Sequence, residues 1–143
     1  MVWVLAAVGV VGVVLVGRVD NWRRDFSTNV ASTRDDPHLA PLKLGGDVAQ
    51  AVQRLKQVVA EMPHWQWVES RQTPGDPAAV SVHLIRSTRL FRFKDDVQVT
   101  IIRAGKDEVV MHVQSRSRLG KGDLGQNPRN IKELLQRVQD ADD

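Results

Sequence analysis

Residues 97–113 read VQVTIIRAGKDEVVMHV, two runs of strand-forming residues on either side of a short turn-forming segment. Apolar residues recur at every second position in the first run, which is typical of a β-strand with one buried face. The segment Ala104-Gly105-Lys106-Asp107 has the composition of a turn, so the two runs predict a β-hairpin. This hairpin fixes an antiparallel sheet as the centre of the fold.

Two further strands and a helix are predicted before the hairpin. The strands cover residues 65–68 and 80–84, separated by a turn-rich segment at residues 73–77. The helix starts after Asp47, a good N-cap that forms a capping box with Gln50, and Pro63 ends it.

A last helix is predicted after the hairpin, with Asn127 as its N-cap and Pro128 in its first turn. The order of helix, four strands and helix predicts an α+β fold. We expect a two-layer sandwich, in which an antiparallel sheet of about four strands carries two helices, plus one N-terminal transmembrane helix. The predicted division is a transmembrane anchor at residues 1–19, an extended connector at 20–46 and an α+β globular domain at 47–143.

The anchor is predicted from residues 2–17, VWVLAAVGVVGVVLVG, which carry no charge. About 17 residues of helix span roughly 25 Å, near the short end for a bilayer crossing. A buried core helix is the first alternative, but such a helix usually has a polar stripe. A cleavable signal peptide is the second, but it usually has positive charge before its apolar region and an Ala-x-Ala pattern after it.

The flanks of this run favour a retained, single-pass anchor. Three arginines follow the run and none precedes it, so the positive-inside rule places the soluble part on the cytoplasmic side. Small residues suit packing against neighbouring helices, and tryptophan among arginines suits the interface. The predicted anchor and interface residues are Trp3, Gly9, Gly12, Gly17, Arg18, Trp22, Arg23 and Arg24.

Composition restricts the chemistry that the chain offers. Twenty Lys and Arg against 17 Asp and Glu give a net charge of only +3, so nucleic acid is not an expected partner. The chain has no cysteine, and its four histidines lack zinc-site spacing, so no metal and no cofactor are expected. No Gly-x-Ser-x-Gly segment or ordered Ser, His and Asp set is present, so the sequence predicts a protein that is not an enzyme.

Residues 120–125, GKGDLG, match the G-x-G-x-x-G pattern of dinucleotide-binding loops. Only 18 residues follow Gly125, too few for the helix, strand and acidic residue of that unit. Two interpretations stay open. Arg116, Arg118 and Lys121 could bind an anion near the start of the last helix, or the segment is a tight turn in which Asp123 pairs with a basic side chain.

Other polar and aromatic pairs allow more than one interpretation. Asp95 and Asp96 are adjacent in a strand, so their side chains should point to opposite faces, and Arg92 and Lys94 flank them. His83 and His112 could meet across strands on the polar face. Two alternating aromatic pairs suit core packing or a lipid-like pocket: Trp65 with Trp67, and Phe91 with Phe93.

Two stretches together resemble a known family. Residues 91–97 read FRFKDDV and residues 115–127 read SRSRLGKGDLGQN. They resemble domain-of-unknown-function family 1499, whose members carry an F-R-F-x-D-D-V-like segment and an S-R-S-R-x-G-x-x-D-L-G-x-N block before the last helix. The resemblance covers about residue 38 to the last helix. Members usually have an Asn-Cys-Val-Ser-Ser-like entry segment, but residues 27–32 read STNVAS, so no role for that cysteine is carried over.

The resemblance implies a bacterial or plastid protein, often membrane-associated, without an established activity. If the two stretches mark a site, they would form one polar network of Arg92, Asp95, Asp96, Arg116, Arg118, Asp123 and Asn127. Structural bracing is the alternative, with an arginine paired to Asp95 or Asp96.

The leading hypothesis for function is a non-catalytic, membrane-anchored accessory or scaffold subunit. It would dock on a larger integral-membrane complex, photosynthetic or respiratory, in a bacterial inner membrane, with the lipid bilayer as its second partner. A membrane-tethered module that binds a small molecule, a lipid or an anion is the alternative.

Overall fold

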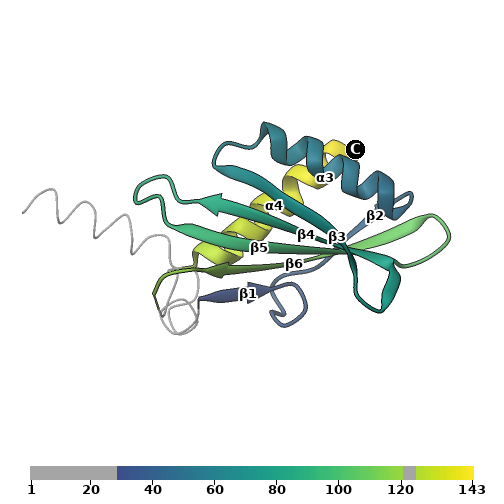
Figure 1. Ribbon diagram of the computed structural model, residues 1–143, viewed down its shortest axis with the longest axis horizontal. Coiled ribbons are helices and arrows are strands. Elements are labelled where there is room, and N and C mark those ends of the chain that lie inside the picture. The colour runs from purple at the N-terminus through teal and green to yellow at the C-terminus, as the bar shows by residue number, and fades with distance from the viewer. Residues whose placement is uncertain (1–28, 121–124) are drawn as a thin grey trace, which may run out of the picture.

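In the computed structural model, the described part of the chain is a six-stranded antiparallel sheet with two helices on one face (Figure 1). The structure describes residues 29–120 and 125–143. In chain order the elements are β1 (Val30–Ser32), β2 (Leu42–Gly45), α3 (Val48–Glu61), β3 (Trp65–Thr73), β4 (Asp76–Ser87), β5 (Lys94–Arg103), β6 (Glu108–Ser117) and α4 (Gln126–Asp142).

The strand order is β1-β6-β5-β4-β3, and β2 pairs with the same edge of β6 as β1 does. All neighbours are antiparallel. The predicted hairpin is the centre of this sheet, with Val99 opposite Val113 and Ile101 opposite Met111. Pairing with the long strand β6 holds the short strands β1 and β2 in place.

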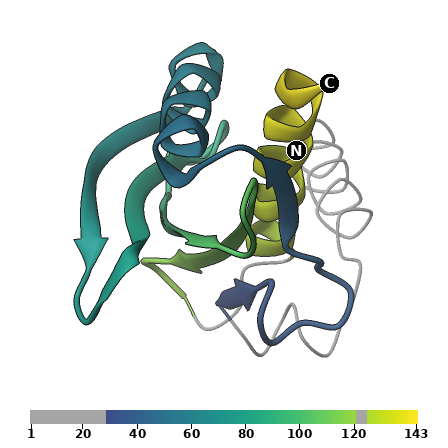
Figure 2. The same ribbon diagram turned by 90° about the vertical axis from the view of Figure 1, so that its right-hand side faces the viewer.

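The hydrophobic core lies between the helices and one face of the sheet, which we call the inner face. In the turned view of Figure 2, α3 and α4 lie on the same side of the curved sheet. Helix α3 covers β3, β4 and β5, whereas α4 covers β6, β1 and β2. Every second residue of the central strands is buried here, including Val82, Leu84, Val97, Val99, Ile101, Val109, Met111 and Val113.

The local rules that predict α3 are confirmed. The Asp47 carboxylate accepts a hydrogen bond from Gln50 N at 2.8 Å, and the Gln50 side chain accepts one from Asp47 N at 3.0 Å. These two bonds satisfy backbone donors that the first turn of a helix leaves unpaired. The helix ends at Glu61, just before Pro63.

The prediction of a sheet of about four strands is wrong, because the sheet has six. Both additional strands, β1 and β2, lie within residues 20–46, the segment predicted as an extended connector. They are three and four residues long, too short to show a period of two. Their pairing depends on the edge of β6, whose paired residues lie about 60 to 90 positions later in the chain.

The transmembrane helix included in the predicted fold is also not found. Neither α3 nor α4 is long and apolar enough to cross a bilayer, and the described ranges contain no other helix that is. The anchor predicted at residues 1–19 lies outside those ranges.

The last helix starts earlier than predicted. Its N-cap is Gly125, which has the left-handed φ of 77°, and its first residue is Gln126. Glycine adopts this conformation without the steric penalty that a β-carbon brings. Asn127 therefore lies inside the first turn, where its side chain is buried and does not cap the helix.

Candidate functional site

The two family-like stretches meet at one end of the sheet, on the left in Figure 1. Asp95 pairs with Ser117 and Asp96 with Arg116 in the β5–β6 ladder, and α4 begins beside them. The two aspartates are consecutive in a strand, so their side chains point to opposite faces of the sheet. Each belongs to a different polar network.

The inner network is buried between β5, β6 and the first turns of α4. Asn130 Nδ2 donates to Asp95 Oδ2 at 2.8 Å and to Ser115 Oγ at 3.1 Å. The Ser115 hydroxyl donates to Asn127 Oδ1 at 2.6 Å. Asp95 is only 1% exposed, and the other three residues are fully buried. A carboxylate at this depth needs such donors, because burial without them is costly.

The same network holds the first described residue of the chain. Asn127 Nδ2 donates to the Asn29 carbonyl at 2.7 Å and to Ser117 Oγ at 3.0 Å. The Asn29 carbonyl also accepts a hydrogen bond from Ser117 N at 2.9 Å, and the Asn29 side chain donates one to the Gly120 carbonyl at 3.1 Å. The start of β1 is therefore joined both to α4 and to the segment after β6.

The outer network lies on the other face of the sheet, around Asp96. Arg118 binds this carboxylate with two hydrogen bonds, from Nε to Oδ2 and from Nη2 to Oδ1, both 2.8 Å long. His83 Nε2 lies 2.8 Å from Oδ1. The Arg118 hydrogen bonds, with a smaller contribution from His83, outweigh partial burial and lower the pKa of Asp96 to about 2. Asp96 is therefore ionised throughout the physiological pH range.

The two central histidines do not meet. His83 stands opposite Gln98, whereas His112 stands opposite Thr100. His112 Nδ1 lies 3.4 Å from the Thr33 hydroxyl, which accepts a hydrogen bond from Val113 N at 3.0 Å. Burial, together with the positive charge of Arg34, lowers the pKa of His112 below its usual value. His112 is therefore a neutral partner of the segment that follows β1.

The β4–β5 loop places two aromatic rings in solvent. Phe91 and Phe93 stack with their ring centroids 5.5 Å apart, and they are 58% and 47% exposed. The prediction that these residues line a core or a pocket is therefore wrong. Arg92 between them has a left-handed φ of 51°, so strand alternation does not continue through the loop. Of the two tryptophans, Trp65 is buried and Trp67 packs against the core.

The other predicted site residues are placed as follows. Arg116 stands on the outer face opposite Asp96 and is exposed, and Arg92 is exposed in the β4–β5 loop. Lys121, Asp123 and all the predicted anchor and interface residues lie outside the described ranges. Within residues 29–120 and 125–143, no group of three or more His, Asp or Glu side chains is arranged to hold a metal ion.

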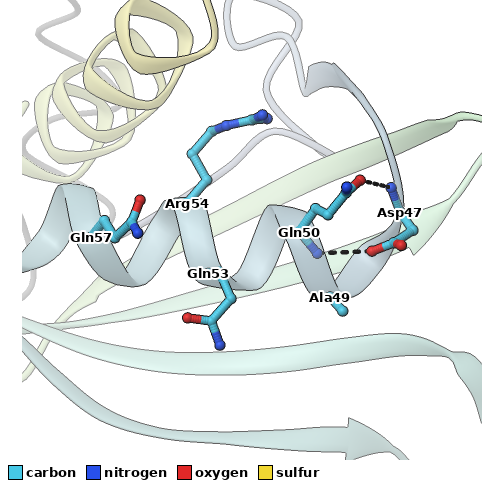
Figure 3. A pocket seen from close by; sticks show the side chains of 6 residues that line it. All are labelled: Asp47, Ala49, Gln50, Gln53, Arg54 and Gln57. Carbon is cyan, nitrogen blue, oxygen red and sulfur yellow. Dashed lines mark hydrogen bonds between the residues drawn. The ribbon is translucent and has the colours of Figure 1, made fainter.

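A shallow pocket of about 390 Å³ lies along the exposed side of α3 (Figure 3). Gln50 turns back toward Asp47 in the capping box, and Gln53 and Arg54 point away from each other. Arg54 forms an ion pair of 2.6 Å with Asp142 of α4. The side chains that line this pocket are therefore engaged with the protein itself or diverge.

A second depression, of about 440 Å³, separates residues 38–42 from α4. Leu39, Leu42, Ile131 and Leu135 form its apolar part, and Lys132 and Gln136 lie among its polar residues. Its mouth is open, so it does not enclose a ligand as most small-molecule sites do.

Two residues of the inner network were not predicted from the sequence. Asn130 is three positions after Asn127 on the same helix face, and Ser115 is two before Ser117 on the same strand face. These spacings, at the helical and strand periods, were the available indication that the two asparagines share one face of the helix and the two serines share one face of the strand.

Most of the chain matches one family model. The model of the family described as "Protein of unknown function (DUF1499)" matches residues 23–138. The chain belongs to the DUF1499 family. The match covers both motif stretches and reaches upstream to β1, so it includes the strands that complete the DUF1499 sheet. No curated protein matches the sequence.

Proposed function

We propose that this DUF1499 protein is a non-catalytic accessory or scaffold subunit that docks on a larger integral-membrane complex. The observation that carries the proposal is that both motif aspartates bind side chains of the protein itself. Asp95 accepts from Asn130, and Asp96 accepts twice from Arg118. Side chains engaged in this way brace strands, helix and loops, as a rigid docking module requires.

The outer face of the sheet supports the proposal as the docking surface. Neither α3 nor α4 covers it, because both pack on the inner face. Exposed amides at Gln98 and Gln114 stand opposite each other there, and the half-buried apolar residues Ile85 and Ile102 lie on the same face. Such a mixture of polar and apolar groups resembles the composition of non-obligate protein interfaces. The Asp96 network holds this surface rigid, so that little entropy is lost on docking.

Membrane location is supported by the sequence before the described domain. Residues 2–17 carry no charge and favour hydrocarbon over water. The family resemblance makes photosynthetic and respiratory complexes the first hosts to test.

The test is to extract membranes that contain the tagged full chain with a mild detergent and to identify co-purifying proteins by mass spectrometry. We expect integral-membrane proteins in stable proportion to the chain. A double variant on the outer face, Gln98→Arg with Gln114→Arg, should lose them, whereas Gln57→Arg on the exposed side of α3 should keep them. Migration of the wild-type chain alone, as a free monomer, would contradict the proposal.

A further inference from the structure

Exposed apolar side chains gather at the end of the sheet where the two motif stretches meet. Leu90, Phe91 and Phe93 belong to the β4–β5 loop and are 71%, 58% and 47% exposed. Leu119, in the segment after β6, is 63% exposed. Val68 is the one other large apolar residue exposed to this degree among the described residues. We call Leu90, Phe91, Phe93 and Leu119 together the apolar tip.

The loop has an ordered structure that presents this tip. Thr88 closes it with three hydrogen bonds: Thr88 N to the Phe93 carbonyl at 2.8 Å, Phe93 N to the Thr88 hydroxyl at 2.9 Å, and Arg92 N to the Thr88 carbonyl at 3.1 Å. The left-handed backbone at Arg92 is unusual for a residue with a β-carbon and carries a conformational cost. Stacked rings on an ordered loop, away from the core, are typical of a surface that contacts something else.

Positive charge surrounds the tip. Residues 88–94 contain Arg89, Arg92 and Lys94, residues 116–120 contain Arg116 and Arg118, and neither segment contains Asp or Glu. Asp96, the nearest exposed carboxylate in the ladder, already accepts two hydrogen bonds from Arg118. The β5–β6 turn at the opposite end of the sheet has mixed charge, with Asp107 and Glu108 close to Lys106. The charge of the tip is therefore a local property.

The chain also enters the domain at this end. Asn29 is bonded to Ser117 and Gly120, next to Leu119. Eleven residues, 18–28, separate the uncharged residues 2–17 from Asn29. Eleven extended residues reach at most roughly 40 Å. If residues 2–17 lie in a bilayer, the end of the domain that is tethered closest to it is the end that carries the tip.

We propose that the apolar tip inserts into the interface of an anionic phospholipid bilayer, with Arg89, Arg92, Lys94 and Arg116 on lipid phosphates, while Arg118 stays bound to Asp96. Aromatic and leucine side chains favour the boundary between headgroups and acyl chains, and basic residues are attracted to anionic lipid. This inference rests on the proposed membrane location and adds an orientation to it. With the tip in the headgroups, the long strands point away from the membrane, and the outer face is turned sideways toward a neighbouring membrane protein.

The absence of cysteine from the chain makes a direct test possible, because one introduced cysteine can be labelled alone. The full-length protein is purified without partners and reconstituted into vesicles. Two tip variants, Leu119→Cys and Phe91→Cys, and one control at the opposite end, Lys106→Cys, carry a polarity-sensitive fluorophore. The vesicles are phosphatidylcholine, alone or mixed with phosphatidylglycerol, and contain lipids with a quencher on the acyl chain. Unchanged thermal unfolding of each variant serves as the folding control.

We expect blue-shifted emission and strong lipid quenching at positions 91 and 119 in the anionic vesicles, and water-like emission at position 106. Replacing Arg89, Arg92 and Lys94 by glutamine should reduce the tip quenching several-fold in anionic vesicles and change it little in neutral ones. Equal lipid quenching of the fluorophore at positions 91, 119 and 106 would overturn the inference. Quenching at positions 91 and 119 that changes neither with the charge of the lipid nor with the glutamine replacements would also overturn it. Shielding of the tip labels only after a partner protein is added would also overturn it, in favour of a protein interface.

The outcome is separable from that of the proposed function. A tip that stays in water while integral-membrane proteins still co-purify refutes only the lipid contact. A tip quenched by lipid in a chain that extracts as a free monomer refutes only the accessory-subunit proposal.

Discussion

Asn130 of α4 donates a hydrogen bond of 2.8 Å to the carboxylate of Asp95 in β5, at a position where that carboxylate is 1% exposed. The same amide group reaches Ser115 of β6 at 3.1 Å. One side chain therefore links the last helix to both central strands. A buried hydrogen bond contributes little net stability while both partners are present, but removing one partner lowers the free energy of unfolding substantially, because the other is left unpaired.

Asn130→Ala should therefore destabilise the protein by about 2–4 kcal/mol, because it takes a donor away from a buried carboxylate. Urea unfolding followed by circular dichroism measures this, with an unchanged slope as the sign of an intact two-state transition. Gln136→Ala is the matched control on the same helix, since Gln136 is exposed and its side chain donates to the exposed Asp140. If Asn130→Ala lowered the free energy of unfolding no more than Gln136→Ala does, by about 0.5 kcal/mol or less, the inner network would not brace the fold.

Asp96 gives a pH dependence of known sign. Its pKa is lowered from 3.8 to about 2 in the folded protein, so its contribution to stability is present above pH 4 and is lost as the pH falls toward 2. The side chain is 36% exposed, so solvent screening limits the contribution to about 1 kcal/mol or less.

The stability difference between wild type and Asp96→Asn should stay nearly constant from pH 6 to about pH 4 and should shrink when urea unfolding is repeated between pH 4 and pH 2. A difference for Asp96→Asn that is constant over this range would argue against the Arg118 pair as its cause.

Ala31 tests whether β1 is an integral strand. It is 5% exposed and pairs with Ser115 of β6, so Ala31→Glu would bury a charge without a partner. We expect a loss of about 3 kcal/mol or more in thermal or urea unfolding. Ala40→Glu makes the same substitution at an exposed position of the following segment and should be close to neutral. Similar, small effects at both positions would restore the interpretation of this region as a connector.

Arg92 tests the backbone of the β4–β5 loop. Two variants that both remove its charge, Arg92→Asn and Arg92→Val, differ in how well they tolerate the left-handed φ of 51°. Arg92→Val should be less stable than Arg92→Asn by about 1–2 kcal/mol in urea unfolding. Equal free energies of unfolding for the two variants would mean that the loop does not hold this conformation in solution.

Local patterns predicted the elements that local physics determines. Asp47 and Gln50 predict the start of α3, and the alternating residues of 97–113 predict the central hairpin. Both depend on groups a few positions apart, so a single sequence contains the necessary information. The opposite directions of Asp95 and Asp96 follow from strand geometry in the same way.

Features that depend on distant partners were not predictable by these rules. Strand β1 exists because β6 offers a free edge, and Asn130 is buried because Asp95 and Ser115 lie opposite it. Phe91 and Phe93 alternate as a strand would, but the left-handed turn at Arg92 separates them from the sheet. In each case tertiary context overrides the local pattern.

Docking of the outer face of the sheet on an integral-membrane protein can be tested by photocrosslinking in intact membranes. A photoreactive residue is placed at Gln98 on the outer face and, as a control, at Gln57 on the exposed side of α3. We predict a discrete crosslinked product with an integral-membrane protein from position 98 and none from position 57. No product from position 98, or the same products from both positions, would contradict the claim.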